Sequence, residues 1–326
     1  MMVLNMKAIV TGGAGFIGSH LVDSLMSRGY EVVVIDNLSA GSLKNLEHHL
    51  NNPKFKFVEA DLKNYEAKWV NEFKDADVVF HFAANPEVRV SSVNPRIHFD
   101  ENLLATFNVL EAVRNNNVKY IVFASTSTVY GEAKVLPTPE DYHPLEPISV
   151  YGSVKLGAEY LHITYSKLYG IRSLIIRYAN IIGSRSNHGV IIDFINKLRK
   201  NPNVLEILGD GTQKKSYLHV YDAVDATLFV FDKFRETSKE YDIFNIGSED
   251  WIRVVEIADI IVEEMGLKNV KYEFVMTTPD GRGWPGDVKI MLLDITKLKK
   301  LGWSPRWNSR EAVRKTVRQI LGKEKA

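Results

Sequence analysis

The chain has 326 residues, of which 45% are hydrophobic and none is cysteine, and it carries 41 Lys and Arg against 40 Asp and Glu. This length allows one large domain or two smaller ones. The balanced charge argues against partners such as nucleic acid or a membrane surface, and the lack of cysteine excludes disulfides and thiol nucleophiles. No apolar run approaches the ~18 residues of a membrane span. The first residues lead directly into a glycine-rich turn, so we expect a cytoplasmic protein without a signal peptide.

Residues 7–36 form the first recognisable unit. Two short apolar runs, at 8–10 and 32–35, are typical of buried parallel strands. Between them, apolar residues recur at helical spacing. Strand, helix and strand in about thirty residues predict a βαβ unit.

Three glycines, Gly12, Gly15 and Gly18, stand at the first strand-to-helix turn. The pattern is weak alone but has the strand and helix context that a dinucleotide site needs. A tight turn that approaches a pyrophosphate requires residues without Cβ, and the helix N-terminus offers free N–H groups. Asp36 ends the second strand, where its carboxylate would accept the ribose hydroxyls and repel a 2′-phosphate. The sequence therefore predicts NAD as cofactor rather than NADP.

Further strands and helices alternate up to Asn180, which predicts an α/β fold with a Rossmann-type doubly wound parallel sheet. The expected strands are 55–58, 78–82, 120–123 and 173–176, and the expected helices include 103–114 and 155–169. After Asn180 the rhythm changes, with helices at 190–200, 220–234, 253–265 and 309–321, a loop at 201–216, and strands at 241–246 and 271–275. We expect an NAD-binding domain at 1–180 with a returning segment near 236–262. Residues 181–235 and 263–326 are expected to form a smaller, discontinuous α+β substrate lobe.

Tyr151 and Lys155 are four residues apart and would share one face of a helix. A free tyrosine has a pKa of about 10, so action as a base near neutral pH requires a large lowering of that pKa. A neighbouring lysine ammonium and a nicotinamide cation could together lower it. Thr126, just beyond a predicted strand, could hydrogen-bond the same reacting oxygen. These residues predict acid–base chemistry at a hydroxyl group.

Motifs spread along nearly the whole chain resemble a known family. They are TGGAGFIG from Thr11, Ser125–Gly131, Tyr151–Lys155, RYAN from Arg177 and LGW from Leu301. The chain resembles the extended short-chain dehydrogenase/reductases, and most closely the UDP-glucose 4-epimerase group. The resemblance implies an NAD-dependent isomerase that interconverts UDP-glucose and UDP-galactose, in galactose metabolism, through a transient 4-keto sugar. It also implies a homodimer that pairs helices 103–114 and 155–169 through apolar residues such as Leu104, Phe107, Val109 and Leu161. The alternative for these apolar residues is that they serve only the core of the monomer.

The resemblance further implies residue roles. Tyr151 would be the acid/base, Lys155 would bind the nicotinamide ribose, and Thr126 would complete the catalytic group. The implied cofactor-binding residues are Gly12, Gly15, Phe16, Ile17, Gly18, Asp36, Asn37, Asp61, Leu62, Phe82, Ala83, Ala84, Asn102, Ala124, Tyr151, Lys155 and Tyr178. The implied substrate-binding residues are Thr126, Asn180, Val190, Leu208, Lys215, Arg282, Asp287 and Met291.

Close relatives with other activities differ by one acid. Sugar 4,6-dehydratases and uronate decarboxylases carry Asp or Glu just after the catalytic Thr, because elimination needs a further proton donor or base. This chain has Ser127 and Thr128 there, and Glu132 is expected to point elsewhere. Epimerisation is therefore favoured. The alternatives are uronate epimerisation, decarboxylation or dehydration, or a non-catalytic NAD-binding protein, which would typically lose the Tyr or the Lys.

The nucleotide clamp departs from the epimerase pattern. Trp284-Pro285-Gly286-Asp287 replaces Arg-x-Gly-Asp, with Arg282 as the nearest arginine, and Lys215 replaces an arginine. Lysine keeps the positive charge but cannot bind a phosphate with two parallel hydrogen bonds as arginine does. The identity of the nucleotide is therefore left open. Met291 falls where the epimerases gate an N-acetyl group, and its intermediate bulk predicts weak turnover of N-acetylated sugars.

The histidines are not expected to be catalytic. His81 ends a strand and is interpreted as a structural hydrogen-bonding residue. His48 and His49 lack an acidic neighbour at metal-ligand spacing, so we expect a surface pair and no metal site.

Overall fold

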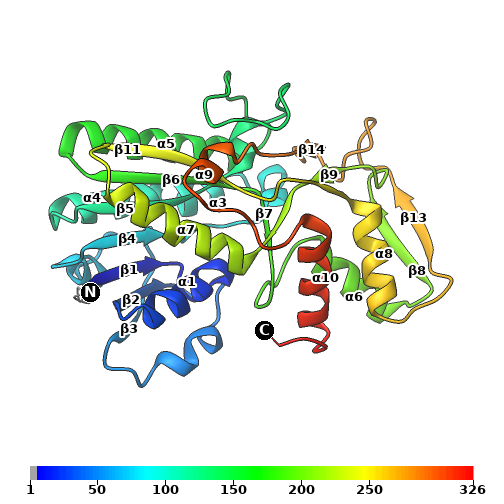
Figure 1. Cartoon of the computed structure of the whole chain (residues 1–326), viewed down its shortest axis with the longest axis horizontal. Coiled ribbons are helices and arrows are strands. Elements are labelled where there is room, and N and C mark those ends of the chain that lie inside the picture. Colours follow the sequence, from blue (N-terminus) through cyan, green and yellow to red (C-terminus); the bar gives the residue numbers. More distant parts are fainter. Residues whose placement is uncertain (1–5, 326) are drawn as a thin grey trace. The chain divides into compact units, whose positions relative to one another are not determined.

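The computed structural model describes residues 6–325 and divides the chain into two compact units (Figure 1). The first unit comprises the chain up to Thr126, with Val150–Arg177 and Thr227–Phe244. The second comprises Ser127–Ser149, Tyr178–Ala226 and the chain from Asn245 onward. Residues 1–5 and 326 lie outside the described residues. The predicted domains include these residues, and the prediction of a chain without a signal peptide rests on the first of them.

The division differs from the predicted domains in four stretches, 127–149, 178–180, 227–235 and 245–262. Residues 127–149 were expected in the first domain but join the second unit, where Asn245 Nδ2 donates to Thr138 O at 2.9 Å. Residues 227–235 were expected in the substrate lobe but join the first unit, because the Phe231 ring packs edge-on against Phe80 at 5.4 Å. Residues 178–180 and 245–262, expected in the first domain, also join the second unit. Long-range contacts of this kind have no local sequence signal.

A seven-stranded sheet organises the first unit, in the order β11-β6-β5-β4-β1-β2-β3 (Figure 1). β1 pairs in parallel with both β2 and β4, and β2–β3 and β4–β5 are also parallel. This confirms the predicted doubly wound Rossmann-type fold, in which ligands bind at the carboxyl ends of the strands near the reversal of strand order. The strands are β1 Lys7–Thr11, β2 Glu31–Asp36, β3 Phe55–Glu59, β4 Val78–His81, β5 Tyr120–Thr126, β6 Arg172–Tyr178 and β11 Tyr241–Ile246.

Helices cover both faces of this sheet. On one face, Ile9 and Val79 of the strands pack with Trp69 and Val109 in a fully buried apolar cluster. Because side chains alternate along a strand, Phe80 points to the opposite face, where it meets Phe231. Val109 was expected to face a partner subunit and instead belongs to this core. The helices are α1 Phe16–Ser27, α2 Ala67–Val70, α3 Arg96–His98, α4 Ala105–Asn115, α5 Val150–Tyr169 and α7 Val220–Arg235, and the tighter or wider turns are η1 Leu43–His49, η2 Asn71–Phe73, η3 Val88–Ser92 and η4 Phe99–Leu104.

The second unit has its own core, built from three amphipathic helices. Phe194, Ile261 and Val317, one from each of α6, α8 and α10, are almost completely buried there. The predicted loop 201–216 was wrong in part, because it contains β8, which pairs in parallel with β13. The elements are η5 Ser127–Tyr130, β7 Asn180–Ile182, α6 Val190–Lys200, β8 Val204–Leu208, β9 Lys214–Lys215, β10 Tyr217–His219, β12 Ile252–Arg253, α8 Val254–Glu264, β13 Lys271–Val275, β14 Ile290–Met291, α9 Thr296–Lys300 and α10 Ser309–Ile320.

Within residues 6–325, the helices are all too short or too polar to cross a membrane.

Candidate active site

The glycine turn between β1 and α1 packs so closely against neighbouring main chain that a residue with a Cβ would collide there. Gly12 has a φ of +70°, and a Cβ there would lie 2.6 Å from Ala83 N. A Cβ on Gly18 would lie 2.2 Å from Gly12 O. Gly15 caps α1 without a side-chain hydrogen bond within the described chain, so the first-turn amides of the helix stay available to an anion.

Asp36 sits at the end of β2 with its carboxylate turned to this glycine turn. Its Oδ2 accepts a hydrogen bond from Ala14 N at 3.0 Å, and its Oδ1 accepts one from Leu38 N at 2.8 Å. Burial raises the pKa of Asp36 above its ordinary value, and these two amides oppose the rise. The amides fix the direction of the carboxylate, and each oxygen keeps acceptor capacity for a ribose hydroxyl. The tight glycine turn, the uncapped start of α1 and Asp36 together fit a dinucleotide such as NAD.

Asn102 lies in the wide turn η4 and is fully buried. Its Oδ1 accepts from Asn85 N at 2.6 Å, and its Nδ2 donates to Asn85 O at 3.1 Å. Asn102 therefore holds the loop that carries Phe82, Ala83 and Ala84. In the structure both ends of the Asn102 amide are hydrogen-bonded to the main chain of Asn85. A direct contact between Asn102 and the cofactor stays a prediction.

The predicted catalytic residues come together in the first unit. α5 begins at Val150, earlier than predicted, so Tyr151 and Lys155 lie one turn apart in its first turns. The Tyr151 hydroxyl is hydrogen-bonded to Thr126, the last residue of β5. Lys155 Nζ donates to Ala124 O at 2.9 Å. The Tyr151 ring also meets His98 edge-on, with centroids 5.5 Å apart.

The electrostatics of this group bear on the predicted lowering of the Tyr151 pKa. Burial raises the pKa of Tyr151 to about 12, opposed only in part by the Thr126 hydrogen bond. Burial lowers the pKa of Lys155 to about 7, so its ammonium is only partly populated near neutral pH. Lys155 therefore does not lower the pKa of Tyr151 in the protein alone. The lowering of the Tyr151 pKa by Lys155 together with a nicotinamide cation stays a prediction.

The predicted substrate residues, apart from Thr126, belong to the second unit. Lys215 of β9 forms an ion pair with the buried Asp287 and stands opposite Met291 of β14 in the sheet. Arg282 Nη1 donates to Asp287 O at 3.1 Å. The structure thus brings together Lys215, Arg282, Asp287 and Met291.

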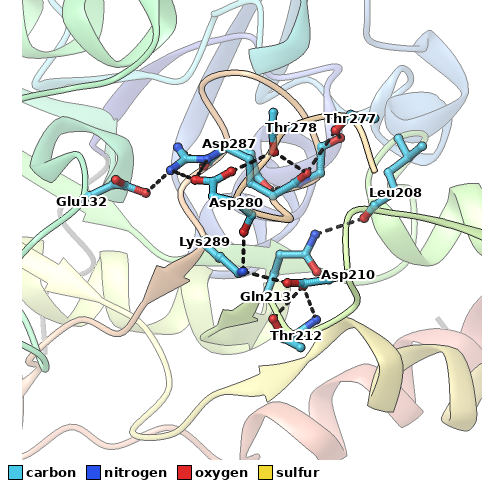
Figure 2. Close-up of polar contacts among 12 residues, drawn as sticks. Glu132, Leu208, Asp210, Thr212, Gln213, Thr277, Thr278, Asp280, Asp287 and Lys289 are labelled. Atoms are coloured by element: carbon cyan, nitrogen blue, oxygen red, sulfur yellow. Dashed lines mark hydrogen bonds and ion pairs between the residues drawn. The ribbon is translucent and has the colours of Figure 1, made fainter. Parts of the chain in front are cut away.

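Two acidic side chains accept hydrogen bonds from Arg282. Its Nη2 donates to Glu132 at 2.8 Å, and its Nε donates to Asp280 at 2.7 Å. Lys289 Nζ donates a hydrogen bond to Asp210 Oδ2 at 2.8 Å (Figure 2). Glu132 and Asp280 were not predicted here, because only the tertiary fold brings Glu132 to this loop.

The remaining substrate candidates lie at element ends of the second unit. Leu208 ends β8, and its carbonyl accepts from Gln213 Nε2 at 3.0 Å (Figure 2). Asn180 begins β7 and donates from Nδ2 to Ser216 O at 3.1 Å. Val190 begins α6. Tyr178, predicted beside the cofactor, is also assigned to the second unit and is buried.

The prediction for His81 is confirmed, whereas the prediction for His48 and His49 is wrong in part. His81 is fully buried between Thr11 Oγ1 at 2.7 Å and Thr106 Oγ1 at 2.9 Å, which confirms its structural role. The expectation that His48 and His49 lack an acidic partner was wrong. Both Nε2 atoms lie within 2.8 Å of Asp23 Oδ1, a donor set that could hold a metal ion. The partner is 25 residues or more away in sequence and is brought near by α1.

Comparison with known proteins identifies the class. Residues 8–247 match the model of the NAD dependent epimerase/dehydratase family. The chain belongs to this family of enzymes, which act on nucleotide sugars, and its cofactor is NAD. The glycine turn, the start of α1 and Asp36 are the part of the chain that fits this cofactor.

Particular relatives carry different sugar specificities. A crystal structure described as UDP-galactose 4-epimerase is 51% identical, with a TM-score of 0.87, and the match covers 98% of this chain and 99% of that one. The UDP-glucose 4-epimerase of Lactobacillus helveticus is 33% identical over 92% of each chain. The UDP-glucuronate 4-epimerase of Thermodesulfobacterium geofontis is 32% identical over 95% of this chain and 94% of its own.

Proposed function

We propose that the protein is a UDP-hexose 4-epimerase that interconverts UDP-glucose and UDP-galactose. The observation that carries the proposal is the hydrogen bond between Tyr151 and Thr126 beside Lys155, with Ser127 and Thr128 next in sequence. This group can move a proton at a sugar hydroxyl, and the sequence offers no carboxylate directly after Thr126 for elimination. The names of the three relatives given above support epimerisation at C4.

In this mechanism Tyr151 takes the proton of the C4 hydroxyl while Thr126 Oγ1 orients that oxygen. When bound, NAD supplies a hydride acceptor for C4 and also the positive charge that a Tyr151 phenolate requires. The 4-keto sugar then turns over in the site, and Tyr151 returns the proton as the C4 hydrogen is restored on the opposite face. Because two faces of the sugar must be presented, most binding energy should come from the nucleotide.

We assign that nucleotide to the second unit. Lys215 and Arg282 are the cations that would face the diphosphate, and Asp287 would accept hydrogen bonds from the ribose. Arg282 is held by Glu132 and Asp280, which fixes its guanidinium before a ligand arrives. Asn180, Val190, Leu208 and Met291 would complete the nucleotide and sugar contacts. The proposal also includes the remaining predicted cofactor residues, a homodimer, a role in galactose metabolism and a cytoplasmic location.

Uronate epimerisation is the second candidate, because one relative of almost full coverage is described as a UDP-glucuronate 4-epimerase. A decarboxylase or dehydratase is less favoured, since both need a further acid or base.

A panel of nucleotide sugars tests the proposal. The purified protein is incubated with UDP-glucose, UDP-galactose, UDP-glucuronate and dTDP-glucose, and products are identified by NMR and mass spectrometry. We expect interconversion of the first two without change of mass. Turnover of UDP-glucuronate alone would replace the proposal by the second candidate. A product lighter by water or carbon dioxide would place the chain with the dehydratases or decarboxylases.

A further inference from the structure

A buried ion pair lies behind the catalytic residues. Glu159 stands on α5 one turn after Lys155, and Arg177 stands on β6. Arg177 Nη2 donates to Glu159 Oε2 at 2.7 Å, and Arg177 Nε donates to Oε1 at 3.0 Å. Their side chains are only 1% and 3% exposed. Desolvation of two charges costs several kcal/mol per ion, so such a pair gives little net stability and calls for another reason.

The same carboxylate is tied to the strand that carries Thr126. Ser125 Oγ donates a short hydrogen bond to Glu159 Oε1. The preceding residue, Ala124, accepts from Lys155 Nζ, and the following residue, Thr126, is hydrogen-bonded to Tyr151. Three consecutive residues of β5, Ala124 to Thr126, are therefore hydrogen-bonded to three side chains on successive turns of α5. Of these three links, the Ser125–Glu159 link is the one supported by a second charge, that of Arg177.

We propose that Glu159, held by Arg177, is a positioning residue that sets the end of β5 against α5 and so fixes Thr126 relative to Tyr151. The inference rests on the proposed function in that Thr126 and Tyr151 are taken as the reacting pair. Ser125 directly precedes Thr126 at the end of β5, and both side chains are hydrogen-bonded to residues of α5. A tether on Ser125 therefore restrains the end of the strand that carries the Thr126 hydroxyl.

Glu159 also acts on Lys155 electrostatically. The titratable groups that face Lys155 are Glu159 and His162 on α5, His81 at the end of β4 and His98 of α3, together with Tyr151. Burial lowers the pKa values of His81, His98 and His162, so these rings are neutral near pH 7. The Glu159 charge raises the pKa of Lys155 against the effect of burial. Loss of that charge should leave Lys155 uncharged at lower pH.

Two substitutions separate positioning from folding. Glu159→Gln removes the charge but keeps an acceptor for Ser125, although it leaves Arg177 unpaired. Ser125→Ala cuts only the tether and leaves the ion pair intact, so it stays testable even where Glu159→Gln does not fold. Asp222→Asn is the control, because Asp222 is equally buried and pairs with Arg306, and both residues belong to the second unit.

We expect Ser125→Ala to lower kcat at least tenfold with little change in KM. Glu159→Gln should lower kcat by a similar factor, and it should also move the alkaline limb of the kcat–pH profile to lower pH. Asp222→Asn should lower stability without moving that limb. The pKa of Lys155 is followed separately by NMR of labelled lysine Cε, with its signal identified by its loss in Lys155→Met. Wild-type kcat in Ser125→Ala would overturn the positioning role, and an unchanged Lys155 pKa in folded Glu159→Gln would overturn the electrostatic part. If the wild type turned over no nucleotide sugar, the proposed function would fail, whereas the NMR titration would still test Glu159.

Discussion

Lys155 Nζ donates a hydrogen bond to the main-chain oxygen of Ala124, 2.9 Å away and two residues before Thr126. The lysine is almost fully buried, and burial lowers its pKa to about 7. The ammonium is thus held against the catalytic strand at a cost in desolvation.

This cost predicts a pH-dependent stability in the ligand-free protein. An unfolded lysine keeps its proton up to about pH 10.4, whereas folded Lys155 releases it near pH 7. Between these values the unfolded state binds more protons, so stability rises with pH. We expect the free energy of unfolding of the wild type, relative to Lys155→Met, to rise by up to ~1.4 kcal/mol per pH unit over this range. Denaturant titrations from pH 6 to 10 measure it, and a constant difference would contradict the buried ammonium.

Asp36 should decide the choice of cofactor. Its carboxylate is fixed by Ala14 and Leu38 and would repel a 2′-phosphate. We expect NAD to bind far more tightly than NADP, and Asp36→Ala to reduce that preference at least tenfold. Asp77→Asn, which removes a carboxylate at the start of β4, is the control and should keep the preference. Equal binding of NADP by the wild type would show that Asp36 does not meet the ribose.

The exposed apolar residues of α4 and α5 are consistent with a subunit interface. Phe107 is 42% exposed and Tyr160 is 55% exposed, whereas Val109 is used in the core. We expect a dimer by analytical ultracentrifugation and a shift toward monomer in Phe107→Glu. Met276→Glu, at an exposed apolar residue of the second unit, should leave the dimer intact. A wild-type particle of 37.0 kDa at micromolar concentration would exclude a stable dimer.

Met291 should limit the size of the sugar. It is buried at the edge of β14, opposite Lys215. Its flexible side chain can yield to an N-acetyl group in part. We expect slow turnover of the N-acetylated UDP-hexose and loss of that activity in Met291→Tyr, with UDP-glucose turnover retained. Equal efficiency on both sugars, unchanged in Met291→Tyr, would remove this residue from the pocket.

The first unit could be predicted in detail because its signals are local. Apolar runs marked the strands, and the glycines of the first turn stand where an added Cβ would collide. The position of Asp36 at the end of β2 followed from the same short segment.

What the sequence left unpredicted depends on long-range contacts. β8 and β13 are short strands that pair across more than sixty residues, and Asp23 meets His48 only through tertiary packing. Arg177 was read as part of a motif, but its partner Glu159 was not identified, because burial of a charge pair has no sequence signature. The raised pKa of Tyr151 likewise follows from burial rather than from its spacing to Lys155.

The central claim is that the hydrogen at C4 leaves and returns within one site, with Tyr151 as acid and base. The most direct measurement follows UDP-glucose carrying deuterium at C4 through the reaction in ordinary water. We predict UDP-galactose that retains the deuterium at C4, and in Tyr151→Phe a rate lower by ~10²–10⁴ with NAD still bound. Replacement of the deuterium by solvent hydrogen would contradict the claim, since it would mean that C4 loses a proton rather than a hydride.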